Sequence, residues 1–161
     1  MLTPLVAVVA RARMLSAQSG PLRQFELKAE SSRFWDLVTA GTPLEKVAGG
    51  FSFTEGPVWD DGGFLYISDE QQNRISRVFP DGRTETVRAS RDPDGATLDR
   101  RHRLIVCLST LRAVIAVSPV GSYTTLAGRY EGKKLNSPND VVLGPVVISF
   151  RSDGRTLSLT A

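Results

Sequence analysis

The chain has 161 residues, which is enough for one domain with a hydrophobic core. Its composition, 41% hydrophobic and 23% charged, is typical of a soluble globular protein. The net charge is +3, and the basic residues are scattered rather than gathered in a run interleaved with aromatic residues, so no nucleic-acid partner is expected.

The first 43 residues are expected to lie outside the main folded domain. Residues 4–10 are apolar, but no Lys or Arg precedes them, and the run is too short to span a membrane. We therefore expect no membrane partner and a cytoplasmic location, with a periplasmic or secreted location as the alternative. Residues 1–43 are assigned to an N-terminal extension and lead-in, in which residues 25–38 form a short helix or an irregular segment.

Short strands separated by turn residues follow from residue 44 onward. The apolar and β-branched runs predict strands over residues 44–48, 56–59, 64–68, 74–79 and 84–88. The turns between them contain Gly, Asp and Asn, which supply the backbone conformations that tight hairpins need. Such short strands with local turns favour an antiparallel meander over alternating strands and helices.

Residues 56–87 are repeated by residues 95–126 without a gap. The matched positions include Asp60 and Asp99, Leu65 and Leu104, Pro80 and Pro119, and Gly82 and Gly121. The second copy predicts strands over residues 96–98, 104–108, 113–117 and 123–126, and a third copy begins at residues 138–143. A repeat of about 40 residues built from short strands is typical of β-propeller blades.

The predicted fold is all-β: a partial β-propeller of about two and a half four-stranded antiparallel blades in residues 44–161. After Val142 the repeat pattern degrades, although a turn remains at residues 152–154. A closed propeller needs about four blades or more, so either further blades lie outside this chain or the propeller is not closed. The last blade would leave an open sheet edge, through which we expect self-association.

Oxygen-bearing side chains occupy comparable places at the starts of two strands. Glu55 stands directly before Gly-Pro in FTEGPVW, and Asn139 and Asp140 stand before a strand in NSPNDVV. The first strands of successive blades converge on the central channel, so one oxygen ligand from each blade could surround a hard cation such as calcium or magnesium. Both motifs are also ordinary turn sequences, which remains the alternative, and Asp140 is assigned a capping role.

Cys107 and His102 are the only cysteine and the only histidine. Cys107 lies within an apolar run, which favours a buried structural thiol over a nucleophile, and a single cysteine forms no intrachain disulfide. His102 lies among arginines in a predicted turn, where nothing completes a zinc site or a Ser-His-Asp triad.

Several motifs together resemble the gluconolactonase and regucalcin-like family. They are FTEGPVW, LYISD followed by RISRV and PDG, the segment DGATLD, and RYEGKKLNSPNDVV, in this order across residues 44–142. Members of this family are six-bladed propellers with a divalent metal in the central channel, so the resemblance implies a partial six-bladed propeller. It also implies metal-dependent hydrolysis of a sugar lactone, in which the metal polarises the carbonyl group and acidifies water.

The resemblance implies roles for two residues. Glu55 matches the family's first metal-binding carboxylate, and Asn139 matches a channel asparagine near metal and substrate, so both are expected metal ligands and Asn139 also binds substrate. Calcium is the expected metal, with magnesium or zinc as alternatives. The family's general base lies in a later blade and matches no residue here, so impaired hydrolysis is expected. The alternatives are a non-catalytic propeller fragment or binding module, and a propeller of the arylesterase or strictosidine-synthase type.

Overall fold

The computed structural model describes residues 27–144, 147–152 and 155–160. The chain divides into two compact units, Met1–Val47 and Ala48–Ala161, each described here by itself. In the first unit, the 3₁₀ helix η1 spans Ser32–Asp36, and the Ser31 hydroxyl caps it by accepting a hydrogen bond from the Arg33 N–H. This short helix falls within the predicted segment 25–38, of which residues 25 and 26 lie outside the described residues. No helix in the described part of the chain is long and apolar enough to cross a membrane.

The strand predicted over residues 44–48 is wrong. These residues take no strand conformation, and Leu44 and Val47 are 57% and 51% exposed. A strand needs a hydrogen-bonding neighbour for its backbone. The first sheet is already complete with four strands, of which the first begins at Thr54.

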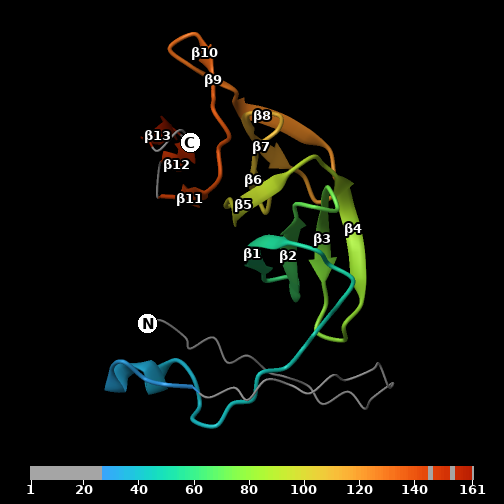
Figure 1. Ribbon diagram of the computed structural model, residues 1–161, viewed down its shortest axis with the longest axis vertical. Coiled ribbons are helices and arrows are strands. Elements are labelled where there is room, and N and C mark those ends of the chain that lie inside the picture. Colours follow the sequence, from blue (N-terminus) through green and yellow to red (C-terminus); the bar gives the residue numbers. More distant parts are fainter. Residues whose placement is uncertain (1–26, 145–146, 153–154, 161) are drawn as a thin grey trace. The chain divides into compact units, whose positions relative to one another are not determined.

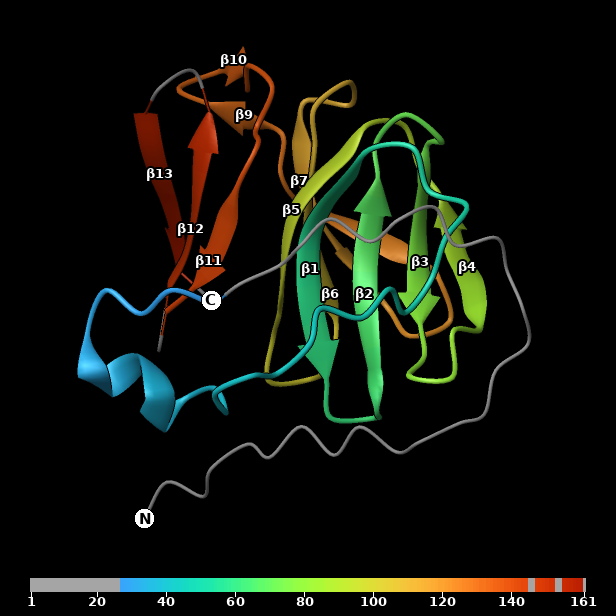
Figure 2. The same cartoon turned by 60° about the horizontal axis from the view of Figure 1, so that its bottom comes forward.

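Two four-stranded antiparallel sheets follow each other, as the repeat predicted. The first consists, in order, of β1 (Thr54–Asp60), β2 (Phe64–Asp69), β3 (Arg74–Val78) and β4 (Thr84–Ala89). The second consists, in order, of β5 (Pro93–Leu98), β6 (Leu104–Leu108), β7 (Ala113–Val117) and β8 (Tyr123–Ala127). The first strands of the two sheets, β1 and β5, lie side by side (Figure 1 and Figure 2).

Regular structure continues after Val142, in the part of the chain where the sequence pattern degrades. A short hairpin of β9 (Arg129–Tyr130) and β10 (Lys133–Lys134) is followed by a third antiparallel sheet of β11 (Val141–Leu143), β12 (Val147–Ser152) and β13 (Arg155–Thr160). β12 pairs with β11 on one side and β13 on the other. Phe150 on β12 is 3% exposed, and burial of such side chains against the second sheet gives the third sheet its packing. Of the predicted turn at residues 152–154, residues 153 and 154 lie outside the described residues.

The second sheet is buried on both faces. One face packs on the first sheet, in a cluster that contains Tyr66, Ile75, Val106, Ile115 and Val117. The other face packs on the third sheet, in a cluster that contains Ile105, Val114, Val141 and Phe150. The nearly continuous apolar runs of β6 and β7 are explained by this double coverage, because alternate residues of a strand point to opposite faces. Sheets stacked through their faces in this way are successive blades of a β-propeller, and the all-β partial propeller is confirmed.

Two arginines of the first sheet form hydrogen bonds with the turn between β7 and β8. Arg77 donates a hydrogen bond to the Pro119 carbonyl oxygen at 2.8 Å, and Arg88 donates to the Gly121 carbonyl oxygen at 3.0 Å. Gly121 has a φ of +84°, and a Cβ there would lie 2.5 Å from the Val87 carbonyl oxygen. The glycine in this turn is therefore required both by the backbone conformation and by the close approach of the first sheet.

Candidate functional site

The starts of β1 and β5 and the segment before β11 lie against one another at one end of the sheets. A Cβ on Gly56 would lie 2.7 Å from both the Asp94 carbonyl oxygen and the Ala96 nitrogen. A Cβ on Gly95 would lie 2.8 Å from the Asn139 carbonyl oxygen, which accepts a hydrogen bond from the Gly95 N–H at 2.8 Å. The two glycines thus allow the backbones of three successive sheets to touch.

Glu55 and Asn139, the two site residues predicted from the sequence, are both found at this end. Glu55 lies on β1 where the pairing with β2 shifts register between Glu55 and Val58, and its side chain is partly buried. Asn139 is exposed and lies two residues before β11. The adjacent Asp140 accepts a hydrogen bond from the Val141 N–H at 2.9 Å, which is the capping role expected of it.

Asp94 is a third residue at this end, and the sequence prediction missed it. It is the second residue of β5, as Glu55 is the second residue of β1. The pairing of β5 with β6 shifts register at the corresponding place, between Pro93 and Ala96. Extending the repeat by one position would have aligned Glu55 with Asp94. Bulges of this kind re-aim side chains and are common beside active sites.

Asp94 is buried, with 3% of its surface exposed, and its carboxylate accepts a hydrogen bond from the Ser109 hydroxyl. Burial raises the pKa of Asp94 to about 6; the hydrogen bond from Ser109 lowers it, while the negative charges of Glu70, Glu55 and Asp92 raise it. The effect of Glu55 places these two carboxylates within electrostatic reach of each other. Negative charge gathered at one end of the inner strands favours a cation there.

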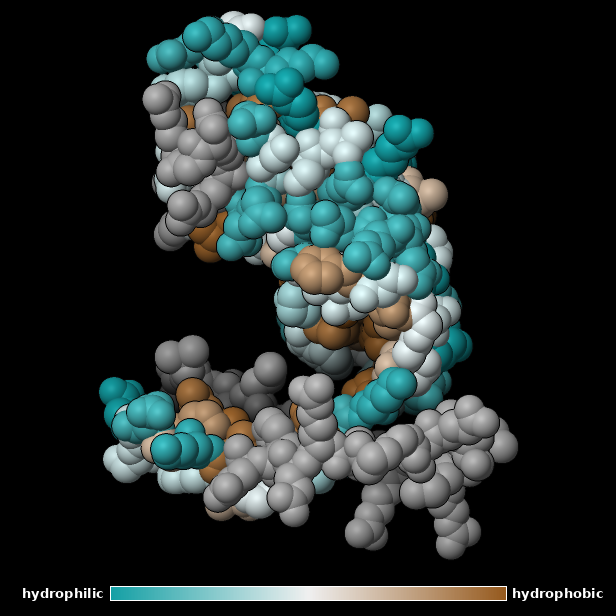
Figure 3. Space-filling model, in the orientation of Figure 1, coloured by the Kyte–Doolittle hydropathy of each residue, from teal (hydrophilic) through white to brown (hydrophobic). Residues whose placement is uncertain are grey.

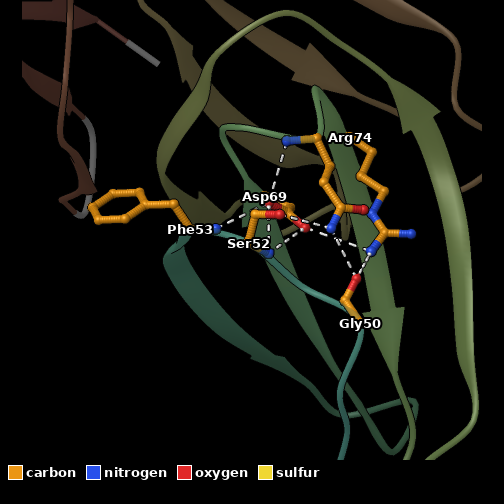
Figure 4. A network of polar contacts seen from close by, with 6 residues as sticks. Gly50, Ser52, Phe53, Asp69 and Arg74 are labelled. Carbon is orange, nitrogen blue, oxygen red and sulfur yellow. Dashed lines mark hydrogen bonds and ion pairs between the residues drawn. The ribbon is translucent and has the colours of Figure 1, made fainter.

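A second buried carboxylate, Asp69, anchors the segment that leads into Glu55 (Figure 4). Asp69 is completely buried, accepts hydrogen bonds from the backbone N–H groups of Ser52 and Phe53, and pairs with Arg74 at 3.5 Å. Arg74 also donates to a carbonyl oxygen of the same segment at 2.6 Å. No role for Asp69 is predicted from the sequence. In the structure, its contacts hold the backbone at Phe53, two residues before Glu55.

Cys107 and His102 take no part in this arrangement. Cys107 is completely buried between the second and third sheets, as predicted, and burial, together with the charges of Asp94 and Asp140, raises the pKa of its thiol to about 12. A thiol with this pKa is not a nucleophile at neutral pH. His102 lies in the turn between β5 and β6, where its side chain is 60% exposed, as expected of a solvated turn residue.

The oxygen donors at this end suit a divalent cation in kind but not in number. Glu55 and Asp94 offer carboxylates and Asn139 offers an amide oxygen, which are ligands that calcium and magnesium take. Within the described residues, no three His, Cys, Asp or Glu side chains are grouped so that they could hold a metal ion. Calcium takes about six to eight oxygens, so these three residues form part of a site rather than a complete one.

Known proteins share both the sequence motifs and this arrangement of sheets. The SMP-30/gluconolactonase/LRE-like region matches residues 53–146, more than half of the chain. The gluconolactonase of Zymomonas mobilis subsp. mobilis is 30% identical over 151 residues, which cover 84% of this chain and 41% of the relative. A solved structure assigned to the gluconolactonase family is 35% identical with a TM-score of 0.70, covering 78% of this chain and 45% of its own. The solved gluconolactonase of Xanthomonas campestris is 31% identical with a TM-score of 0.61, covering 65% of this chain and 36% of its own.

The stacked sheets and the site at their inner ends define the class as a β-propeller protein. The chain belongs to the SMP-30/gluconolactonase/LRE-like family, and the resemblance read from its motifs is confirmed. It spans about two fifths of the length of the curated relative that it matches. The relatives that it matches in this family are gluconolactonases.

Proposed function

We propose that the end of the sheets carrying Glu55, Asp94 and Asn139 is part of the active site of a metal-dependent sugar-lactone hydrolase. The observation that carries the proposal is the convergence of three consecutive inner strands, each of which brings one oxygen-bearing residue to the same end. The substrate class, a cyclic sugar ester, follows from the names of the relatives, which are gluconolactonases.

The residues have different binding roles in this proposal. Glu55 is the charged metal ligand and Asn139 the neutral one, and calcium is preferred to magnesium or zinc because the donors are hard oxygens in a loosely filled site. Because Asn139 is exposed, its amide is also available to hydrogen-bond a sugar hydroxyl. When bound, a divalent cation polarises the lactone carbonyl and acidifies a water molecule.

Asp94 adds fixed negative charge to the same end. Its buried carboxylate is held by the Ser109 hydroxyl, and the Ser68 hydroxyl donates to its backbone oxygen at 2.8 Å. None of the three residues is assigned as the general base. A single copy of the chain is therefore expected to bind calcium weakly and to hydrolyse lactone slowly, because three donors fill about half of the coordination that calcium takes.

Hydrolysis of glucono-δ-lactone, followed as acid release at constant pH, tests the proposal. We expect slow hydrolysis that requires calcium, that EDTA abolishes, and that Glu55→Gln lowers by about tenfold or more. Glu85→Gln is the matched control, because it changes a carboxylate on β4, the outermost strand of the first sheet, and should leave the rate unchanged. Hydrolysis that is indifferent to both EDTA and Glu55→Gln would contradict the proposal.

One observation favours a second candidate, a calcium-binding module that does not turn over lactone. The described residues offer three donors and no assigned base, which is enough to attract a cation but not to complete the reaction. Calcium binding without lactone hydrolysis would support this candidate. Hydrolysis of aryl esters in preference to lactones would instead favour the arylesterase type of propeller.

A further inference from the structure

Arg112 is the last residue of the turn between β6 and β7, and its backbone has a φ of +59°. This left-handed conformation suits glycine or asparagine and disfavours a long side chain such as that of arginine. A residue kept in a disfavoured conformation often serves through its side chain. The Arg112 guanidinium donates hydrogen bonds to two backbone carbonyl oxygens, that of Leu135 and, at 3.4 Å, that of Lys134.

The internal repeat supplies a second residue with the same place and the same kind of contact. Asn73 aligns with Arg112, ends the turn between β2 and β3, and has a φ of +54°. Its side-chain oxygen accepts a hydrogen bond from the Asp92 N–H at 3.1 Å, and its carbonyl oxygen accepts one from the Ser90 N–H at 2.8 Å. Asp92 lies two residues before Asp94. The last residue of each turn therefore binds the backbone that leads into the oxygen-bearing residue of the next sheet.

The segment between β10 and β11 leads to Asn139 without forming a strand. At its start, Leu135 is 3% exposed and packs in the cluster between the second and third sheets. Near its end, Pro138 is completely buried, and its carbonyl oxygen lies 3.4 Å from the Ser109 hydroxyl. The Asn139 carbonyl oxygen then accepts the hydrogen bond from the Gly95 N–H. The path of the backbone to Asn139 is thus fixed at several points along its length.

The hairpin of β9 and β10, which precedes this segment, is exposed. Its strand residues are all exposed, and Figure 3 shows hydrophilic surface where Figure 1 places the hairpin. Within the hairpin, Arg129 donates a hydrogen bond to the Gly132 carbonyl oxygen at 2.8 Å. What holds this part of the chain against the second sheet is therefore at the base of the hairpin, where Leu135 is buried and Arg112 binds its carbonyl oxygen.

We propose that Arg112 is a positioning residue that fixes Asn139 at the inner end of the third sheet. The guanidinium is planar and always charged, so its two hydrogen bonds hold two successive carbonyl oxygens in one orientation. Leu135 lies four residues before Asn139, and the φ of the intervening Pro138 is fixed by its ring, so a displacement of Leu135 is passed on to Asn139. The binding role of Asn139 rests on the proposed function, whereas its position does not.

Hydrogen exchange of the Gly95 N–H, followed by NMR in the full chain, tests this positioning without any activity. The Gly95 N–H donates to the Asn139 carbonyl oxygen, so its protection reports whether Asn139 is in place. Arg112→Gly removes the guanidinium but suits the positive φ, so the turn itself should persist. We expect exchange at Gly95 to accelerate about tenfold or more relative to the core amides of β6 and β7, which report global unfolding.

Two further variants connect this effect to the guanidinium of Arg112. Arg112→Lys keeps a cation that can reach one of the two carbonyl oxygens, so its exchange rate at Gly95 should lie between those of wild type and Arg112→Gly. Arg129→Gln is the matched control, because it removes another guanidinium that binds a backbone carbonyl oxygen and should leave exchange at Gly95 unchanged. Exchange that is unchanged in Arg112→Gly, that accelerates only as much as the core amides, or that accelerates equally in Arg129→Gln overturns the proposal.

Calcium titration shows whether this positioning serves the proposed function. Arg112→Gly should weaken calcium binding about threefold or more, but should have little further effect in a protein that already carries Asn139→Ala, because it acts through Asn139. An equal loss of affinity with and without Asn139→Ala would show that Arg112 acts independently of Asn139 and would overturn the proposal. If Asn139→Ala binds calcium like wild type while exchange at Gly95 responds as expected, the positioning role is upheld and only the proposed function loses support.

Discussion

Among single residues, Asp94 is the one whose chemistry depends most on its place in the fold. Burial and the neighbouring charges of Glu70, Glu55 and Asp92 disfavour its ionised form, and the Ser109 hydroxyl only partly compensates. At neutral pH the fold therefore holds a negative charge that it would be more stable without. A cation bound beside Asp94 would offset this cost.

We expect the stability of the calcium-free protein to fall as the pH rises from about 4 to about 6. The pKa of Asp94 is raised from 3.8 to about 6. The folded state thus holds this proton more tightly than the unfolded state, and the stabilisation that is complete below pH ~4 is lost as the pH rises through ~6. Asp94→Asn should remove this part of the pH dependence and stabilise the protein at pH ~7 by on the order of 2 kcal/mol.

Urea unfolding of wild type and Asp94→Asn in EDTA, across this pH range, measures the effect. Only the difference between the two proteins counts, because other carboxylates titrate in both. If the difference in unfolding free energy were the same at every pH, the raised pKa of Asp94 would be contradicted.

Gly95 is expected to tolerate no side chain, for reasons of space. An added Cβ would lie 2.6 Å from a side-chain oxygen of Asp140 and 2.8 Å from the Asn139 carbonyl oxygen, so Gly95→Ala should push the second and third sheets apart. We expect a loss of about 1–3 kcal/mol in the free energy of unfolding. Gly128→Ala is the control, since its Cβ would make an ordinary contact of 3.8 Å with Thr125. Equal losses in the two variants would show that the close approach at Gly95 has no energetic importance.

Glu55 and Asn139 could be predicted from the sequence because each stands in a recognisable motif at the start of a strand. Asp94 was missed because the repeat was taken to begin one residue later, at the glycine. Asp69 had no sequence signal of its role, because its partners are backbone N–H groups that lie 16 and 17 residues away along the chain. Contacts of this kind become visible only when the loop before β1 is folded over the turn after β2.

At the level of secondary structure, the loop before β1 depends on the buried carboxylate of Asp69. Asp69→Ala would leave the N–H groups of Ser52 and Phe53 without their acceptor and Arg74 without its ion-pair partner. We expect a loss of about 2–4 kcal/mol in the free energy of unfolding. Asp81→Ala, at a side chain that is 63% exposed, should change stability by less than about 0.5 kcal/mol.

The positioning role of Asp69 predicts more than a loss of stability. Because Asp69 holds the backbone two residues before Glu55, calcium affinity should fall in Asp69→Ala even under conditions in which the variant is fully folded. Asp69→Asn keeps one side-chain oxygen acceptor and should recover part of the affinity. An Asp69→Ala variant that is unstable but binds calcium like wild type would limit Asp69 to a purely structural role.

The local sequence pattern is sufficient to predict some of the strands but not all of them. In the two repeated units, turn residues and alternating apolar residues act together, so eight strands were placed correctly. The run at residues 44–48 has the composition of a strand but no neighbour to pair with. β12 and β13 lack the expected turn spacing, yet they pair with β11 and bury Phe150 against the second sheet. In both cases, whether a strand forms depends on a pairing partner that lies elsewhere in the chain.

For the whole molecule, the sequence repeat was enough to predict a stack of sheets in the correct order. The second sheet is the centre of this stack, because both of its faces are covered and its inner strand lies between β1 and β11. The inner ends of the three sheets lie against one another only because Gly56 and Gly95 allow backbone contact. Each sheet thus contributes one oxygen-bearing residue, Glu55, Asp94 or Asn139, to the same end of the stack.

Calcium titration of the full chain by isothermal calorimetry tests this convergence most directly. Saturable binding is expected, weakened about tenfold or more by Glu55→Gln, Asp94→Asn and Asn139→Ala taken singly, since ligand charge and number set calcium affinity. Glu85→Gln on β4 should bind calcium like wild type. Binding that is absent, or that is the same in wild type and all four variants, would contradict a shared cation site at the inner ends of the three sheets.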